Sequence, residues 1–248
     1  MSEAHDRLAE LIRSAGSVVA LTGAGVSVPS GIPDFRSPGT GLWANVDPME
    51  VAHISVWRRQ PERFWSFYGP RFALLDGKRP NGAHTALAEL GIPVITQNID
   101  GLHAAAGSRD VIEIHGSVAS SSCQVDGRRY ELAETRARLA ADADGVPRCD
   151  CGAPLKPDVI LFGEMLDETA MTRASTLAAG ADLMLCVGSS LEVYPAAGLP
   201  ELTLEAGGRI AIVTKSETPF DRFAAVRLGG DVEEEMRAVL AALANPGH

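Results

Sequence analysis

The sequence has no excess of positive charge. Lysine and arginine number 22 against 32 aspartates and glutamates, which gives a formal net charge of −10 and an isoelectric point near 5.1. Nucleic-acid binding needs a basic surface, because contacts to phosphate dominate it. We therefore predict no nucleic-acid partner. A mildly acidic surface would favour lysine-rich protein substrates, although it also simply keeps a protein solvated.

Long apolar runs are also absent. No stretch reaches the ~20 apolar residues of a membrane-spanning helix, and MSEAHDRLAELIRS at the start lacks the basic and apolar parts of a secretion signal. We predict a cytoplasmic protein with no membrane partner. Cysteine is scarce, and three of the four cysteines, Cys123, Cys149 and Cys151, lie close together. In a reducing compartment such a cluster favours a metal over disulfide bonds.

The 248 residues, 46% of them hydrophobic, are enough for one large core. Short apolar runs alternate with helical patterns, which predicts an α/β fold with a mostly parallel, doubly wound, Rossmann-like sheet. Strands are expected at 18–21, 94–96, 111–114, 159–162, 183–187 and 210–213, and helices at 4–14, 84–90, 132–140, 168–179, 196–206 and 232–244. Residues 44–80 are rich in aromatic side chains between prolines, which predicts short helices.

The most informative stretch is VVALTGAGVSVPSGIPDFR, residues 18–36. Its apolar strand leads into Gly23 and Gly25, and a strand followed by a glycine turn and a helix start can hold a pyrophosphate on backbone N–H groups. Val28 stands where the GxGxxG motif has its third glycine, so the motif alone leaves a tight turn without a ligand open. The segment GIPDFR suits a lid over a bound nucleotide.

Polar residues follow two more of the predicted strands. Asn98 and Asp100 come after the second strand, and His115 directly follows the third. Because the carboxyl ends of parallel strands form the ligand edge of such a sheet, we expect these side chains to meet there. A histidine in this place can act as a general base, although a structural role is also common. Its neighbours favour catalysis.

Six blocks of the sequence strongly resemble the sirtuins, the NAD-dependent protein lysine deacylases, in their bacterial type. Besides TGAGVSVPSGIPDFR, the blocks are TQNIDGLH (96–103), EIHG (113–116), KPDVILFGE (156–164), GSSLEVYPAA (188–197) and TKSETPFD (214–221). The resemblance implies an NAD-dependent protein lysine deacetylase whose partners are acylated-lysine proteins or peptides. In that family the acyl oxygen attacks the NAD ribose, nicotinamide leaves, and O-acetyl-ADP-ribose forms with the deacylated lysine.

The resemblance also assigns roles to residues. His115 is the base acting on the ribose, Asn98 positions the ribose or a water, and Asp100 lines the nicotinamide pocket. The cofactor-binding residues it implies are Gly23, Ala24, Gly25, Val28, Asp34, Phe35, Arg36, Gln97, Ile99, Gly188, Ser189, Ser190, Thr214, Lys215 and Asp231. Thr214 departs from the family, which commonly has asparagine there, and it has no amide for a bidentate hydrogen bond.

For the substrate, the resemblance implies an extended peptide added as a strand between two segments. The residues implied are Val159, Phe162, Gly163, Glu164 and Val193. Tyr68 and Arg71 have the spacing with which some sirtuins bind the carboxylate of a succinyl or malonyl group. We expect deacetylation, with desuccinylation or demalonylation as the alternative.

The cysteine cluster departs from the family's two C-x-x-C pairs for structural zinc. Cys123 matches the first ligand, Asp126 stands in the place of the second, and Cys149 and Cys151 form a shortened pair. Because a carboxylate can also ligate zinc, a site with three cysteines and one aspartate is possible. A metal-free remnant of the module is the alternative.

We predict three parts in the chain. Residues 1–43, 81–118 and 155–248 would form the NAD-binding Rossmann-like domain, residues 44–80 a helical insertion, and residues 119–154 a small cysteine-containing zinc module. Two other functions stay open: a non-catalytic protein that binds NAD or ADP-ribose, and ADP-ribosyl transfer. A nicotinamide-dependent dehydrogenase is disfavoured by the incomplete GxGxxG. The sequence gives no oligomeric state.

Overall fold

The computed structural model describes residues 3–34, 39, 41, 46–75 and 77–245. Its elements, in chain order, are α1 (Glu3–Ser14), β1 (Val18–Thr22), η1 (Ala24–Ser30), α2 (Pro48–Val51), α3 (Ile54–Arg59), α4 (Pro61–Leu74), α5 (Gly82–Leu90), β2 (Val94–Thr96), α6 (Leu102–Ala105), β3 (Val111–Glu113), β4 (Gly116–Cys123), β5 (Arg129–Glu131), α7 (Leu132–Ala141), β6 (Leu155–Val159), α8 (Glu168–Ala179), β7 (Leu183–Val187), η2 (Ala196–Gly198), α9 (Leu199–Glu205), β8 (Arg209–Val213), η3 (Asp221–Phe223), β9 (Ala224–Leu228) and α10 (Val232–Ala244).

The larger sheet has six strands in the order β3-β2-β1-β7-β8-β9, and every neighbouring pair is parallel. The four inner strands are almost wholly buried apolar runs, as a sheet covered on both faces requires, whereas the edge strands β3 and β9 are partly buried. The chain order reverses direction between β1 and β7. In doubly wound folds, ligands bind at the carboxyl ends of the strands beside such a reversal. The predicted Rossmann-like sheet is confirmed.

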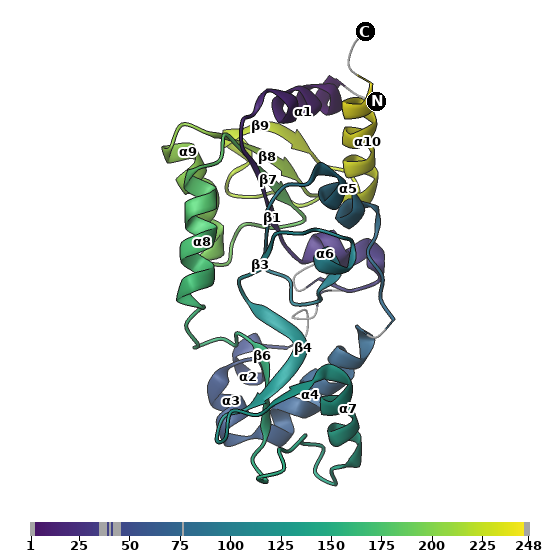
Figure 1. Cartoon of the computed structure of the whole chain (residues 1–248), viewed down its shortest axis with the longest axis vertical. Helices are drawn as coiled ribbons and strands as arrows, with labels where there is room; N and C mark the ends of the chain where they lie inside the picture. Colours follow the sequence, from purple (N-terminus) through teal and green to yellow (C-terminus); the bar gives the residue numbers. More distant parts are fainter. Residues whose placement is uncertain (1–2, 35–38, 40, 42–45, 76, 246–248) are drawn as a thin grey trace.

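Helices cover both faces of this sheet (Figure 1). One apolar cluster joins α1, α5 and α10 to one face, with Leu8, Leu87 and Met236 fully buried. The other joins α8 and α9 to the opposite face through small residues such as Ala174 and Ala178, which let the helix approach closely. The final helix begins after Asp231, whose side chain caps it by accepting a hydrogen bond from the N–H of Glu233.

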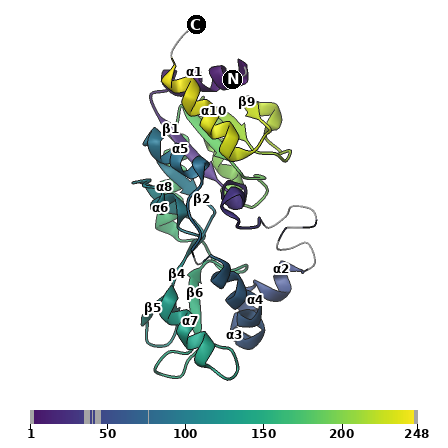
Figure 2. The same ribbon diagram turned by 90° about the vertical axis from the view of Figure 1, so that its right-hand side faces the viewer.

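A second, smaller sheet lies at the other end of the molecule, with α2, α3, α4 and α7 around it (Figures 1 and 2). Its three strands follow the order β5-β4-β6 and pair antiparallel. The strand predicted at 159–162 is wrong in extent and in place, because β6 ends at Val159 and belongs to this sheet. The residues after it form a turn instead.

One feature of the helical part differs from expectation. Pro70 does not break a helix but lies inside α4, which runs for 14 residues. The large buried side chains Phe64, Trp65 and Phe72 on this helix compensate for the missing backbone donor by packing into a common core.

The domain boundaries at 44–80 and 119–154 stay a prediction. Of the described helices, none is both long and apolar enough to cross a membrane.

Candidate active site

His115 stands immediately beyond β3, at the ligand edge of the larger sheet. Its Nδ1 lies 2.9 Å from the carbonyl oxygen of Gln97. A carbonyl only accepts, so Nδ1 carries the hydrogen, and a neutral ring keeps the lone pair of its Nε2 for a proton. Burial lowers the pKa of His115, and the bond to Gln97 partly offsets this effect. The imidazole is therefore held in the tautomer of a general base.

Asn98 and Asp100 are joined through a serine on another element. The hydroxyl of Ser27 on η1 donates to Asp100 Oδ2 at 2.7 Å and accepts from Asn98 Nδ2 at 3.1 Å. The same amide group contacts the carbonyl oxygen of Gly23 at 3.2 Å. The turn after β1 and the turn after β2 are thus fixed to each other by buried hydrogen bonds. Both predicted polar residues lie at the sheet edge, as expected.

Two buried histidines support this network, and sequence reasoning missed both. His84 on α5 contacts the hydroxyl of Ser27 at 3.4 Å through Nε2 and closes the N-terminal capping box of its helix. His103 on α6 contacts Thr22 Oγ1 at 2.9 Å, and its pKa is lowered to about 3, by burial first and by His84 second. The pattern Asn81-x-x-His84 was the available signal, since it fits a capping box.

Gly25 and Gly188 bring the two turns at the chain reversal into direct contact. The N–H of Gly25 donates to the carbonyl of Gly188 at 2.8 Å, and that of Gly23 donates to Val187. A Cβ on Gly25 would lie 2.7 Å from the Gly188 oxygen, and one on Gly188 would collide with the backbone of Val26. These two N–H groups are therefore used within the protein and are not free for a phosphate.

Polar groups for a nucleotide remain on the β7 side. The hydroxyl of Ser189 accepts from Gln97 Nε2 at 2.9 Å and from the N–H of Leu191 at 3.2 Å, so its own hydrogen is left for another acceptor. Ser190 beside it is half-buried. Further along the same edge, Lys215 pairs with Asp231 at 3.0 Å.

Several other predicted cofactor residues can be placed only in part. Ala24 lies in η1, Val28 is 43% exposed, and Asp34 is half-buried. Thr214 directly follows β8 and is buried, and its N–H donates to the carbonyl of Leu228. Ile99 packs against the apolar cluster around α4. Phe35 and Arg36 lie outside the described residues.

The predicted substrate segment begins next to the candidate base. The N–H of Ile160 donates to the carbonyl oxygen of His115 at 2.8 Å. Phe162, whose side chain is 40% exposed, pairs through its backbone with Ala52 and Ile54. Val159 is buried, whereas Gly163 and Glu164 form the turn that follows. Val193 on the second predicted segment is half-buried.

Tyr68 and Arg71 share one face of α4. Tyr68 packs into the apolar cluster that also holds Ile99 and Val159, and burial raises the pKa of its hydroxyl. The Arg71 guanidinium lies 3.4 Å from the ring centroid of Phe67 and donates to that residue's carbonyl. Its Nε is buried without a hydrogen-bond partner, and burial lowers the pKa of Arg71. Among the described residues, no carboxylate pairs with it.

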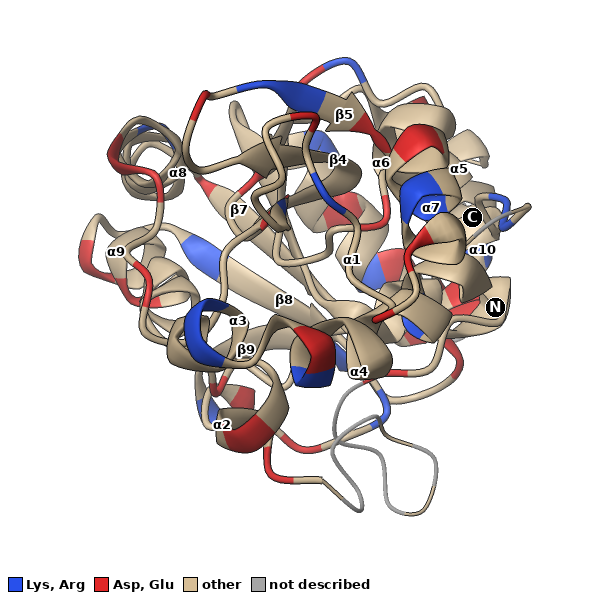
Figure 3. Cartoon of the chain, turned by 90° about the horizontal axis from the view of Figure 1, so that it is seen from below, with Lys and Arg blue, Asp and Glu red and all other residues tan. Residues whose placement is uncertain are grey.

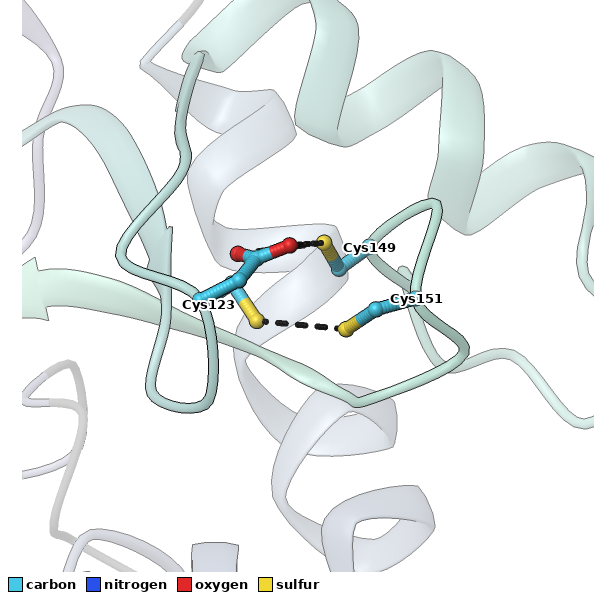
Figure 4. A group of neighbouring side chains, drawn as sticks. Cys123, Cys149 and Cys151 are labelled. Atoms are coloured by element: carbon cyan, nitrogen blue, oxygen red, sulfur yellow. Dashed lines mark hydrogen bonds between the residues drawn. The ribbon is translucent and has the colours of Figure 1, made fainter.

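The four predicted metal ligands come together at one end of the small sheet, and Figure 4 shows the three cysteines among them. The ligand atoms of Cys123, Asp126, Cys149 and Cys151 all lie within 4.8 Å of one another. The sulfurs of Cys123 and Cys151 are 3.6 Å apart, and the Asp126 oxygens lie 3.3 and 3.5 Å from the Cys149 sulfur. Tetrahedral zinc with bonds of about 2.0 to 2.3 Å needs ligand separations of about 3.5 to 3.8 Å. The donor types suit zinc and the two closest pairs have about these separations, so the residues can hold zinc once the wider pairs draw closer.

The fold and this edge define a class: a Rossmann-like α/β protein with a neutral imidazole at the carboxyl edge of its parallel sheet. Comparison with known proteins narrows the class. The model of the Sir2 family matches residues 23–195. The chain belongs to the Sir2 family.

Relatives and solved structures agree with this assignment. An NAD-dependent protein deacetylase of Sulfolobus acidocaldarius is 45% identical, over 90% of this chain and 88% of that protein. The NAD-dependent protein deacetylase of Thermotoga maritima is 42% identical, over 93% and 95% respectively. A structure of Sir2 with a deacetylated p53 peptide and 3′-O-acetyl ADP ribose superimposes with a TM-score of 0.90 at 39% identity, covering 94% of this chain and 96% of that one.

Proposed function

We propose that this protein is an NAD-dependent protein lysine deacetylase that releases nicotinamide and forms O-acetyl-ADP-ribose. The observation that carries the proposal is the His115 imidazole, whose Nδ1–H is bound by Gln97 so that Nε2 can accept a proton. It lies on the ligand edge of a sheet of the dinucleotide-binding type. Relatives over 40% identical that span most of the chain are named as such enzymes, which supports the proposal.

The chain's own groups are suited to orient the reactants and to move protons. When bound, NAD supplies a ribose carbon open to attack and nicotinamide as the leaving group. His115 takes a proton from a ribose hydroxyl, and its bond to Gln97 steadies the imidazolium that results. Asn98, held by Ser27 and Gly23, presents an oriented amide to the sugar. No residue need act as a covalent nucleophile.

The partner is an acylated lysine in a protein or peptide. Solved Sir2 structures contain a p53 peptide with NAD+ and a propionylated peptide, at 39% identity to this chain. In this chain, the backbone of residues 160–164 and the segment around Val193 would receive the peptide as an added strand. Recognition through the backbone gives weak dependence on the peptide's sequence.

The experiment incubates the purified protein with NAD and an acetyl-lysine peptide and measures free nicotinamide and deacetylated peptide. Equal amounts of both are expected. NAD binding without any nicotinamide release would instead favour a non-catalytic protein that binds NAD or ADP-ribose. NADH formation, seen as new absorbance, would indicate a dehydrogenase.

A second acyl specificity is favoured by one observation, the Arg71 guanidinium. It is partly buried, its Nε has no partner, and it lies near Tyr68, which packs against the cluster that holds Val159. A guanidinium in this state can bind the carboxylate of a succinyl or malonyl group. Turnover of acetyl and succinyl versions of one peptide tests this: Arg71→Met should lower succinyl turnover about tenfold or more while acetyl turnover changes little. Equal losses for both peptides would contradict it.

The cytoplasmic location stays a prediction, and ADP-ribosyl transfer and the oligomeric state stay open. ADP-ribosyl transfer to the peptide is separated from deacylation by the mass of the products. The location in the cell and the oligomeric state need direct measurement.

Along the described ribbon, acidic and basic residues are interspersed at the small-sheet end, without one dominant sign (Figure 3).

A further inference from the structure

The segment after β6 closes into a tight turn. The N–H of Glu164 donates to the carbonyl of Leu161 at 3.0 Å, and Gly163 has a positive φ of 82°. The same glutamate reaches back, and its Oε2 accepts from the N–H of Leu161 at 2.8 Å. Residues 161–164 are thus closed by one backbone bond and one side-chain bond. Phe162 stands at the exposed corner of this turn.

A buried lysine holds the carboxylate that closes the turn. Lys156 Nζ lies 2.9 Å from Glu164 Oε2 and donates to the carbonyls of Val159 and Pro157 at 2.8 and 3.2 Å. The three contacts use all three donors of the ammonium group. The side chains of Lys156 and Glu164 are only 9% and 21% exposed. Removing one partner of a buried pair leaves the other charge uncompensated, so the turn would move to bring that charge to water.

The position of this turn matters for the substrate, an argument that rests on the proposed function. The chain enters the turn from Ile160, which is hydrogen-bonded to the backbone of His115. The turn therefore fixes where the peptide-binding backbone lies relative to the imidazole. His53 supports it from outside: its Nδ1 accepts from the N–H of Ser55, while its Nε2 faces Gly163 so closely that a Cβ there would clash.

We infer that Lys156 and Glu164 form a positioning pair for the acyl-lysine peptide. The pair touches neither the candidate base nor the residues proposed for NAD. It acts through the turn, whose backbone would carry the peptide strand. Its removal should therefore weaken peptide binding, whereas NAD binding and the chemical step at His115 should change little.

Steady-state kinetics of the full chain with an acetyl-lysine peptide separate these effects. Lys156→Met should raise the KM for the peptide about tenfold, with the KM for NAD and kcat within about twofold of wild type. Glu164→Gln, which keeps the shape of the side chain, should act in the same direction. Lys156→Arg keeps the charge and several donors and should restore most of the peptide KM. In the double variant the two effects should not multiply, because they remove one interaction.

The matched control is Arg173→Met, which breaks an exposed ion pair between α8 and Asp110, at the amino end of β3; it should leave all three parameters unchanged. A peptide KM unchanged in Lys156→Met and Glu164→Gln overturns the inference. So does a rise in the KM for NAD equal to the rise for the peptide, since that indicates a general structural loss. A wild-type protein that releases no nicotinamide contradicts the proposed function instead, and peptide binding by fluorescence anisotropy then tests the pair directly. If Lys156→Met does not fold, the KM of Glu164→Gln for the peptide tests the inference on its own.

Discussion

At the scale of single residues, His115 is the group on which the proposed chemistry depends. His115→Ala removes the base but leaves the backbone bond that Ile160 makes to residue 115. Deacetylation should fall by about 10²-fold or more, while the urea midpoint of unfolding stays near that of the parent protein. Nicotinamide release and urea unfolding on one preparation check both. Near-normal turnover in this variant would remove the histidine from the mechanism.

His103 makes a second prediction, about stability and pH. Its folded pKa of about 3 lies below the ordinary value of 6.5 because the ring is buried. At a pH between these two values, His103 is protonated in the unfolded chain but neutral in the folded protein. The free energy of unfolding should therefore fall with falling pH from about 6.5 downward, at up to about 1.4 kcal/mol per pH unit from this group.

Urea denaturation of the parent protein and of His103→Gln, at steps between pH 7 and pH 4.5, measures this effect. The variant should have a flatter dependence on pH. Identical slopes would show that His103 takes no part. The lowered pKa of His84 acts in the same direction and remains in both proteins.

Residues of the site differed in how well the sequence predicted them. Asn98 and Asp100 come soon after one apolar run and His115 directly after another, so their place at the sheet edge follows from the fold class. The contact of Ser27 with His84, 57 positions apart, depends on how α5 packs, which no local pattern records. Asp126 was predicted from a family motif, and the geometry of its carboxylate fits the predicted ligand set.

At the scale of elements, the turns after β1 and β7 approach each other so closely that a side chain on Gly188 would collide with backbone. Gly188 has a φ of 62°, and a Cβ there would meet Gly25 C at 2.6 Å and the backbone of Val26. Gly207 has a φ of 87° but nothing within 4 Å of a Cβ. Gly188→Ala should therefore cost about 3 kcal/mol of unfolding free energy or more, whereas Gly207→Ala should cost only about 1 to 2. Equal costs would mean that backbone strain alone, and no close approach, explains the glycine.

Elements with strong apolar runs were predicted well, and those without were not. The strands at 183–187 and 210–213 agree within a residue. β6 has the sequence LKPDV, whose polar residues do not look like a strand. Its lysine can be buried because it pairs with Glu164, which no local pattern shows. β9, only partly buried as the edge strand of the sheet, was missed for a similar reason.

At the scale of the whole molecule, we predict that a bound metal stabilises the cysteine-containing end of the small sheet. The cluster around Cys123 and Cys149 has few apolar residues, Tyr130 and Leu155 among them. A bound zinc would supply the missing stabilisation. The protein should contain about one zinc per chain, and Cys149→Ala should lose the metal and unfold at lower temperature. Cys186→Ala, which removes a buried cysteine of β7, should keep it. A wild-type protein without zinc after growth in zinc-supplemented medium would support the metal-free alternative.

The arrangement in two sheets was only half predictable. The parallel sheet follows from alternating strands and helices, but the antiparallel one is built from short, polar strands whose pairing links residues 116–123 to 155–159. Such pairing is set by the packing of α4 and α7 around it, which apolar periodicity does not encode.

The most direct test is a product analysis. Wild-type protein, NAD and an acetyl-lysine peptide are incubated together, and the products are weighed by mass spectrometry. One O-acetyl-ADP-ribose is predicted for each nicotinamide released and each lysine freed. Free acetate without that ester, or ADP-ribose attached to the peptide, would contradict the proposed reaction.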